Sequence, residues 1–159
     1  MAPVDLAQKS AAKKIALRSD PFPELKFMTV VRVTIGPQGQ IHKRPKKFYA
    51  SQKNRDIVTW DITNQSGQDI EVSVTNFLRR VDCSDDEGTV PVNPFIWLDS
   101  NTVELRAGEE AFIDGRVDPN YLRLNNNDDD CFSYSIVVTS TSGAPAFEID
   151  YDPDGDIKP

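Results

Sequence analysis

The chain has 159 residues, of which 38% are hydrophobic and 27% charged, and its formal net charge at pH 7 is −7. This length is sufficient for one domain with its own hydrophobic core. No transmembrane segment is expected, because no stretch reaches the ~20 apolar residues of a membrane-spanning helix. The N-terminus lacks the basic and apolar regions of a secretory signal, which leaves the localisation open, with cytoplasmic as the default.

Charge is distributed unevenly along the chain. Residues 1–55 contain twelve Lys and Arg but three Asp and Glu, a net of +9, whereas residues 56–159 have a net of −16. Two interpretations follow from this asymmetry. Either the basic segment lies against the acidic remainder, which we prefer, or a basic arm binds an anionic partner.

Residues 1–25 are predicted to form a short flexible N-terminal arm before a folded domain that spans 26–159. Residues 10–17 could form two helical turns, but a helix this short is marginally stable in water. Pro21 and Pro23 would end such a helix, because each proline restricts the residue before it.

The remaining sequence alternates between short β-prone runs and turns. Strands are expected at 27–35, 57–63, 70–77, 103–106, 111–113, 132–139 and 146–151. The segments 57–63 and 70–77 give the strongest signal, because both alternate apolar and polar residues and a glycine turn separates them. Seven or eight short strands at this spacing predict an all-β sandwich or small barrel.

From Ile57 onward the pattern resembles the cupredoxin-like fold, the Greek-key sandwich of blue-copper proteins. Residues 58–67 are similar to its central strand and turn, and 103–109 to the strand and turn before its late strands. Residues 132–137 are similar to the strand that carries the ligand cysteine in copper-binding members. The resemblance implies an all-β Greek-key β-sandwich, cupredoxin-like or Ig-like, with seven or eight strands.

The residues of a copper site are absent from the sequence. A blue-copper site needs two imidazoles, a thiolate and usually a thioether. Ile136 stands where the cysteine would be, residues 139–145 contain no His or Met, and His42 is the single histidine. We therefore expect no copper.

The C-terminal segment contains four aspartates at alternate positions, Asp150, Asp152, Asp154 and Asp156, with Gly155 between the last two. This pattern matches the start of an EF-hand-type calcium loop, in which carboxylate oxygens converge on one cation. However, the bidentate Glu at loop position twelve would fall after Pro159, and a strand rather than a helix precedes the motif. Calcium is therefore the alternative prediction, set against a solvated acidic tail.

Two further features leave alternatives open. Cys83 and Cys131 are flanked by aspartates and could form a disulfide or remain reduced thiols. The segment 42–49 interleaves basic and aromatic residues, with Lys43, Arg44, Lys46 and Lys47 before Phe48 and Tyr49. Such a segment could bind phosphates and stack bases, or it could protect an edge strand containing Pro45 from pairing. The net acidity argues against nucleic acid.

The loop 79–101 contains an apolar group, Phe95, Ile96 and Trp97, that would contact a partner if it were exposed. No arrangement of nucleophile, base and orienting group is visible, so no enzymatic activity is expected. The sequence thus predicts a non-enzymatic binding or structural module that contacts a protein partner or its own copies through this loop and the basic segment. A calcium-binding sandwich module is the alternative.

Overall fold

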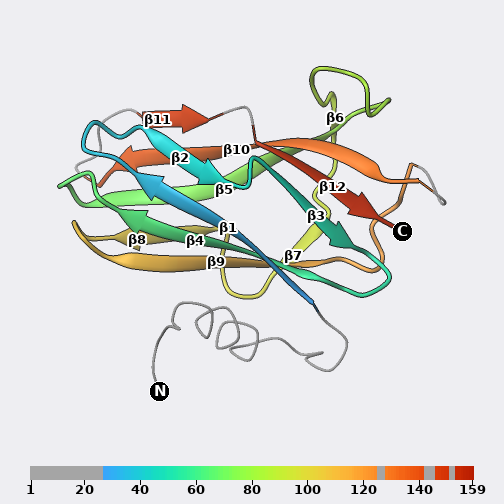
Figure 1. Cartoon of the computed structure of the whole chain (residues 1–159), viewed down its shortest axis with the longest axis horizontal. Helices are drawn as coiled ribbons and strands as arrows, with labels where there is room; N and C mark the ends of the chain where they lie inside the picture. Colours follow the sequence, from blue (N-terminus) through green and yellow to red (C-terminus); the bar gives the residue numbers. More distant parts are fainter. Residues whose placement is uncertain (1–26, 125–127, 142–145, 151–152) are drawn as a thin grey trace.

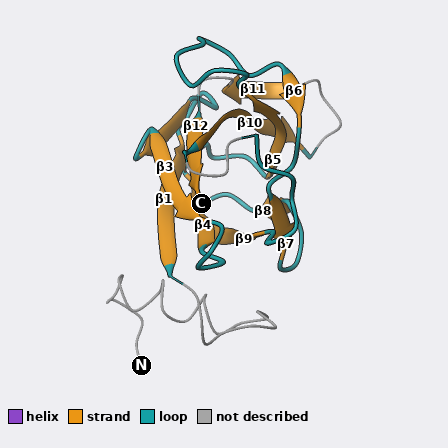
Figure 2. Ribbon diagram, turned by 90° about the vertical axis from the view of Figure 1, so that its right-hand side faces the viewer, coloured by secondary structure: helices purple, strands orange, loops and turns teal. Residues whose placement is uncertain are grey.

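The computed structural model describes residues 27–159 except 125–127, 142–145 and 151–152. The described residues form twelve strands in two sheets that enclose one hydrophobic core (Figures 1 and 2). This arrangement confirms the predicted all-β sandwich. In the part of the chain described, no helix has the length and apolarity needed to span a membrane.

The first sheet has five strands. Their order across the sheet is β2 (Ile41–Arg44), β1 (Met28–Ile35), β4 (Ile57–Asn64), β9 (Glu110–Val117) and β7 (Phe95–Trp97). β1 and β4 run parallel, whereas the other neighbours are antiparallel. The strands β2 and β7 therefore form the two edges.

The second sheet has seven strands. Its main order is β3 (Lys47–Ser51), β12 (Asp154–Lys158), β10 (Asp130–Ser140), β5 (Ile70–Arg79) and β6 (Val90–Pro91), with β11 (Ala146–Asp150) also paired to β10 and β8 (Thr102–Leu105) to β5. β12 pairs in parallel with β3 and antiparallel with β10.

Aromatic side chains from both sheets meet in the core. The cluster consists of Phe48, Trp60, Phe77, Phe95, Trp97 and Tyr134. Trp60 on β4 is fully buried and donates a 3.1 Å hydrogen bond from Nε1 to the hydroxyl of Tyr134 on β10. This bond joins the two sheets and satisfies the polar atoms of two large buried rings.

The chain passes from one sheet to the other at Pro45. This proline follows a cis peptide bond and lies between β2, an edge of the first sheet, and β3, an edge of the second. Of the loop and the edge strand expected at this proline, the structure shows the loop, because residues 45 and 46 lie between the two edge strands and belong to neither. Proline is tolerated here because no strand ladder needs the N–H that it lacks.

The structure contains more strands than the seven or eight predicted. The additional ones are short: β2 and β3 lie on either side of Pro45, β6 and β7 lie in the region 79–101 that was expected to be mostly loop, and β12 lies in the predicted acidic tail. Strands of two to five residues carry too few positions for a periodic signal. The predicted arm at 1–25, with its helical turns at 10–17, lies outside the described residues.

Candidate functional site

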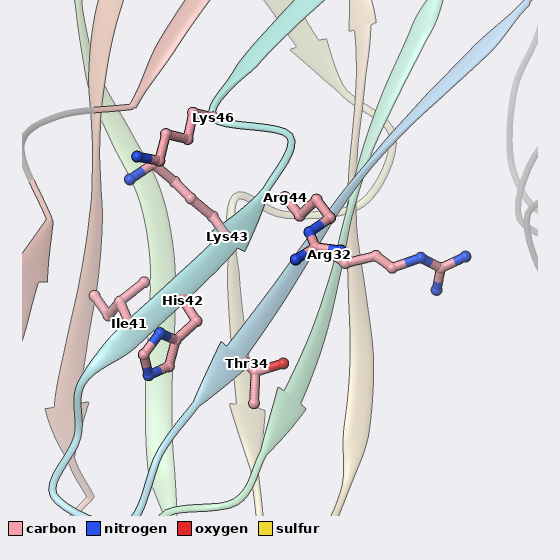
Figure 3. Close-up of a pocket in the computed structure, with 7 residues that line it drawn as sticks. All are labelled: Arg32, Thr34, Ile41, His42, Lys43, Arg44 and Lys46. Atoms are coloured by element: carbon pink, nitrogen blue, oxygen red, sulfur yellow. The ribbon is translucent and has the colours of Figure 1, made fainter.

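A hollow of about 510 Å³ lies along the β2 edge of the first sheet (Figure 3). We call it the β2 groove, and it is lined by Arg32, Thr34, Ile41, His42, Lys43, Arg44 and Lys46. In Figure 3, Arg32 and Arg44 extend to one side of β2 and Lys43 and Lys46 to the other.

A tight hairpin positions these side chains. Gly36 donates a 2.8 Å backbone hydrogen bond to Gln40, and Gly39 has a φ of 81°, a value that favours glycine. Val33 and Ile35 of β1 point into the core, so Arg32 and Thr34 point outward. The register pairs Thr34 with His42 and Arg32 with Arg44, which places these four side chains on the outer face.

The outer face of the hairpin carries incompletely balanced positive charge. Arg32 and Arg44 lie directly opposite each other, a like-charge arrangement that is unfavourable across strands. Arg32 approaches one carboxylate, with its Nη1 3.3 Å from Oδ2 of Asp61. Burial raises the pKa of Asp61 to about 7, and Glu110 adds to the rise. Near neutral pH, Asp61 therefore offsets only part of the charge of Arg32.

Arg44 and Lys46 differ from the other basic residues of the segment. Among the described residues neither forms an ion pair. Lys43 pairs with Asp150 at 2.5 Å, with 11% and 13% of the two side chains exposed, and Lys47 lies 3.8 Å from Asp156. Two of the four predicted basic contacts are thus occupied within the molecule, whereas Arg44 and Lys46 have no carboxylate partner among the described residues.

The predicted calcium residues face separate cations. Asp150 pairs with Lys43, Asp154 with Arg80 at 2.7 Å, and Asp156 with Lys47. Asp152 lies outside the described residues, and among the residues that the structure describes no three His, Cys, Asp or Glu side chains are placed to hold a metal. Calcium binding stays a prediction that this arrangement does not favour.

The predicted apolar contact loop is largely part of the core. Phe95 is 4% exposed and Trp97 is half-buried against Trp60 and Phe77, whereas Ile96 is 39% exposed. The alternation of β7 explains this, because its first and third side chains point to the same face. Of the three residues, Ile96 is the one that presents substantial surface.

Cys83 and Cys131 form a disulfide that fastens the acidic loop 81–89 to β10. Arg80 lies beneath this loop, 8% exposed, and donates to the carbonyls of Phe132 and Asp86 as well as to Asp154. It helps to line a second hollow of about 640 Å³. Both terminal nitrogens of Arg80 are occupied by these bonds, and the bond to Asp86 holds the loop in place.

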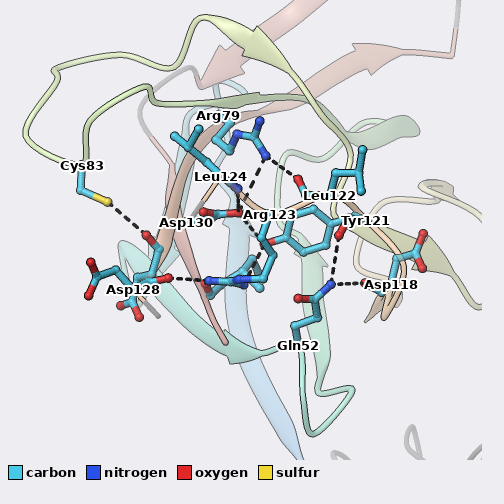
Figure 4. A network of polar contacts seen from close by, with 12 residues as sticks. Gln52, Arg79, Cys83, Asp118, Tyr121, Leu122, Arg123, Leu124, Asp128 and Asp130 are labelled. Carbon is cyan, nitrogen blue, oxygen red and sulfur yellow. Dashed lines mark hydrogen bonds and ion pairs between the residues drawn. The ribbon is translucent and has the colours of Figure 1, made fainter. Parts of the chain in front are cut away.

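A polar network closes the end of the sandwich next to this loop (Figure 4). The buried Tyr121 donates a 3.0 Å hydrogen bond to Asp130, and Arg79 donates a 2.7 Å bond to the carbonyl of Leu122. Burial, and then the charge of Asp130, raise the pKa of Tyr121, so the phenol stays protonated. The network therefore stabilises this end of the fold.

Sequence reasoning missed Arg32, which completes the β2 groove, and the buried Arg80. The alternation of 27–35 could have placed Arg32 on the outer face. No sequence signal identifies Arg80 as buried, because its partners lie 6, 52 and 74 residues away.

No family model matches the chain, and no curated protein matches its sequence. Its fold is similar to those of solved chaperone structures, of which we give three. The CsuC–CsuE chaperone–tip adhesion subunit pre-assembly complex of Acinetobacter baumannii has a TM-score of 0.52 at 10% identity over 72% of this chain and 49% of that one. The periplasmic chaperone SfaE has a TM-score of 0.53 at 9% identity, over 72% of this chain and 55% of that one. The E. coli chaperone DraB has a TM-score of 0.51 at 10% identity, over 84% of this chain and 58% of that one.

The present chain spans about half the length of these chaperone chains. At such identities the likeness shows an Ig-type sandwich fold and nothing finer. The cupredoxin-like topology expected from the sequence stays a prediction.

Proposed function

We propose that this domain is a non-enzymatic protein-binding module that engages its partner along the β2 edge of the first sheet. The observation that carries the proposal is that β2 is an edge strand, to which β1 alone pairs among the described strands, and that it borders the β2 groove. An exposed sheet edge presents unpaired main-chain groups to which an extended peptide can add as a further strand.

The register of the hairpin identifies which groups are available. Gly36 and Gln40 form a hydrogen-bonded pair, and such pairs alternate along an antiparallel ladder. His42 and Arg44 therefore bond to β1 through their main chains. The N–H and C=O groups of Ile41 and Lys43 point away from β1, toward an incoming strand.

Two observations support a protein partner. A chaperone of similar fold was crystallised with a pilus tip adhesion subunit, so this sandwich architecture is used for holding another protein. In addition, aromatic side chains from the two sheets pack against one another in the core, which leaves the sheet edges as the accessible main chain of the described sandwich.

Site-specific photocrosslinking in the source cells tests the proposal. A photoreactive residue in place of His42, on β2, is expected to give an adduct with a defined protein. The matched control carries the same group in place of Lys53, an exposed residue in the turn after β3. Adducts at neither position, or the same adducts at both, would overturn the edge-binding function, and an adduct of twice the chain mass would identify a second copy as the partner.

A further inference from the structure

We infer that the segment pairing with β2 is an extended acidic peptide with carboxylates at alternate positions. The inference rests on the proposed function, because it assigns the chemistry of the partner that would occupy the β2 groove. It also names the side chains that would select this partner. Arg44, His42 and Arg32 would do so on the outer face, and Lys46 at the end of the strand.

The spacing of the basic side chains suits a strand. His42 and Arg44 are two residues apart on one face of β2, a separation of about 6.8 Å. Residues at alternate positions of an added strand have the same spacing on the same face. Carboxylates at those positions would reach both side chains at once, and a guanidinium can bind a carboxylate through two parallel hydrogen bonds.

The electrostatics of the hairpin favour an incoming carboxylate. Of the two opposed arginines, Arg32 alone has an ion pair in the described structure, and its partner Asp61 has a pKa of about 7 that leaves it only partly ionised at neutral pH. Arg32 has a side chain that is 58% exposed, so its free donors face solvent. A carboxylate that reaches Arg44 from an added strand would offset the positive charge that Arg44 places opposite Arg32.

A nucleic acid fits the same surface less well. Base stacking needs an exposed aromatic beside the cations. Phe48 is 1% exposed in the core. Tyr49 is 51% exposed, but it does not line the β2 groove, and Nζ of Lys158 lies 5.5 Å from its ring centroid. Residues 56–159 also carry a net charge of −16, which would repel a long polyanion. A short acidic strand confined to the groove avoids that repulsion.

The acidic loop of a second copy is also a poor occupant. Loop 81–89 is folded into turns, with Asp85 donating from its backbone to the carbonyl of Asp82 at 2.9 Å and Ser84 donating to the Asp82 carboxylate at 2.9 Å. The disulfide at Cys83 holds it in that form. It therefore cannot present an extended edge to β2 without unfolding locally.

Fluorescence anisotropy with a labelled peptide of about eight residues, alternating Glu and Val, tests the inference. The intact protein is expected to bind this peptide and to bind the matched Gln–Val peptide at least about tenfold more weakly. Arg44→Glu should lose about tenfold in affinity and Arg44→Gln less. Lys53→Glu, which makes the same charge change at a distance, should stay within about twofold, because screening weakens distant exposed charges.

The Arg44→Glu variant is expected to fold, because the new carboxylate would lie opposite Arg32 and form a favourable cross-strand pair. A loss of peptide binding can therefore be attributed to the charge change. Equal binding of the Gln–Val peptide, or an equal loss in Lys53→Glu, would overturn the inference. Tighter binding of a single-stranded oligonucleotide than of the Glu–Val peptide, lost in Arg44→Glu, would also overturn it. If the His42 crosslink to a protein persists in Arg44→Glu, the proposed function stands and only the acidic partner is refuted.

Discussion

At the scale of single residues, Asp61 stands out because it is a carboxylate 7% exposed on the sheet, with no donor to its Oδ1 in the described structure. Burial is the main cause of its raised pKa of about 7, Glu110 adds to the rise, and Arg32 opposes it. The folded protein therefore retains a proton that the unfolded chain releases above about pH 4. The stability that this proton provides is present at low pH and is lost as the pH rises toward 7.

Asp61→Asn should consequently stabilise the protein at pH 8, by about 1–3 kcal/mol, and have little effect at pH 4. The amide keeps the shape of the side chain without a buried charge. Urea denaturation at both pH values measures the difference. Asp99→Asn, at an exposed position, is the control and should change neither. An equal effect of Asp61→Asn at the two pH values would show that ionisation is not responsible.

At the scale of elements, loop 81–89 is the segment whose position depends most on a covalent bond. The Cys83–Cys131 disulfide closes a separation of 48 residues, and the loop is otherwise held by Arg80 bonding to the carbonyl of Asp86 and by Gly88 bonding to Ser133. A cross-link of this span restricts the unfolded chain.

Replacing both cysteines with serine is expected to lower the free energy of unfolding by about 2–4 kcal/mol. Guanidinium denaturation measures it, and the wild-type protein with an excess of dithiothreitol should match the variant. An unchanged unfolding midpoint would mean that the remaining contacts of Arg80 and Gly88 are sufficient to hold the loop.

The long strands were predictable, whereas most of the short ones were not. The segments 57–63, 70–77 and 132–139 correspond closely to β4, β5 and β10, because their alternation is supported by burial of one face. β12 has the composition of a turn, and its Gly155 suggested a sharp bend. The structure gives that glycine a different reason: a Cβ there would lie 2.1 Å from the ring of Phe48, so only glycine fits.

At the scale of the whole molecule, the uneven charge is partly resolved by contacts between the two ends of the domain. Lys43 pairs with Asp150 across 107 residues, and Lys47 pairs with Asp156. Alternation within the sequence indicates which face a side chain occupies but not which distant strand lies beside it. The pairs agree with the preferred interpretation that the basic segment lies against the acidic remainder. The sequence did not indicate which residues pair, so the basic residues and the aspartates were listed as separate sites and the β2 groove could not be located.

These ion pairs also determine the expected response to calcium. Excess calcium should move the melting midpoint by less than about 1 °C relative to EDTA, because each described carboxylate of the motif faces a cation that calcium would have to displace. A ligand at about one hundred times its dissociation constant would add about 2.7 kcal/mol and raise the midpoint by several degrees. A rise of that size, abolished by Asp156→Asn, would establish the calcium site instead.

The last strand in chain order, β12, fills an interior place between β3 and β10. Before residues 154–158 are synthesised, the first half of β10 has an unpaired side and β3 has no strand partner. Unpaired strand edges of this kind make folding intermediates prone to pair with other chains. A chain truncated before residue 154 is therefore expected to associate with foreign strands and not simply to form a shorter domain.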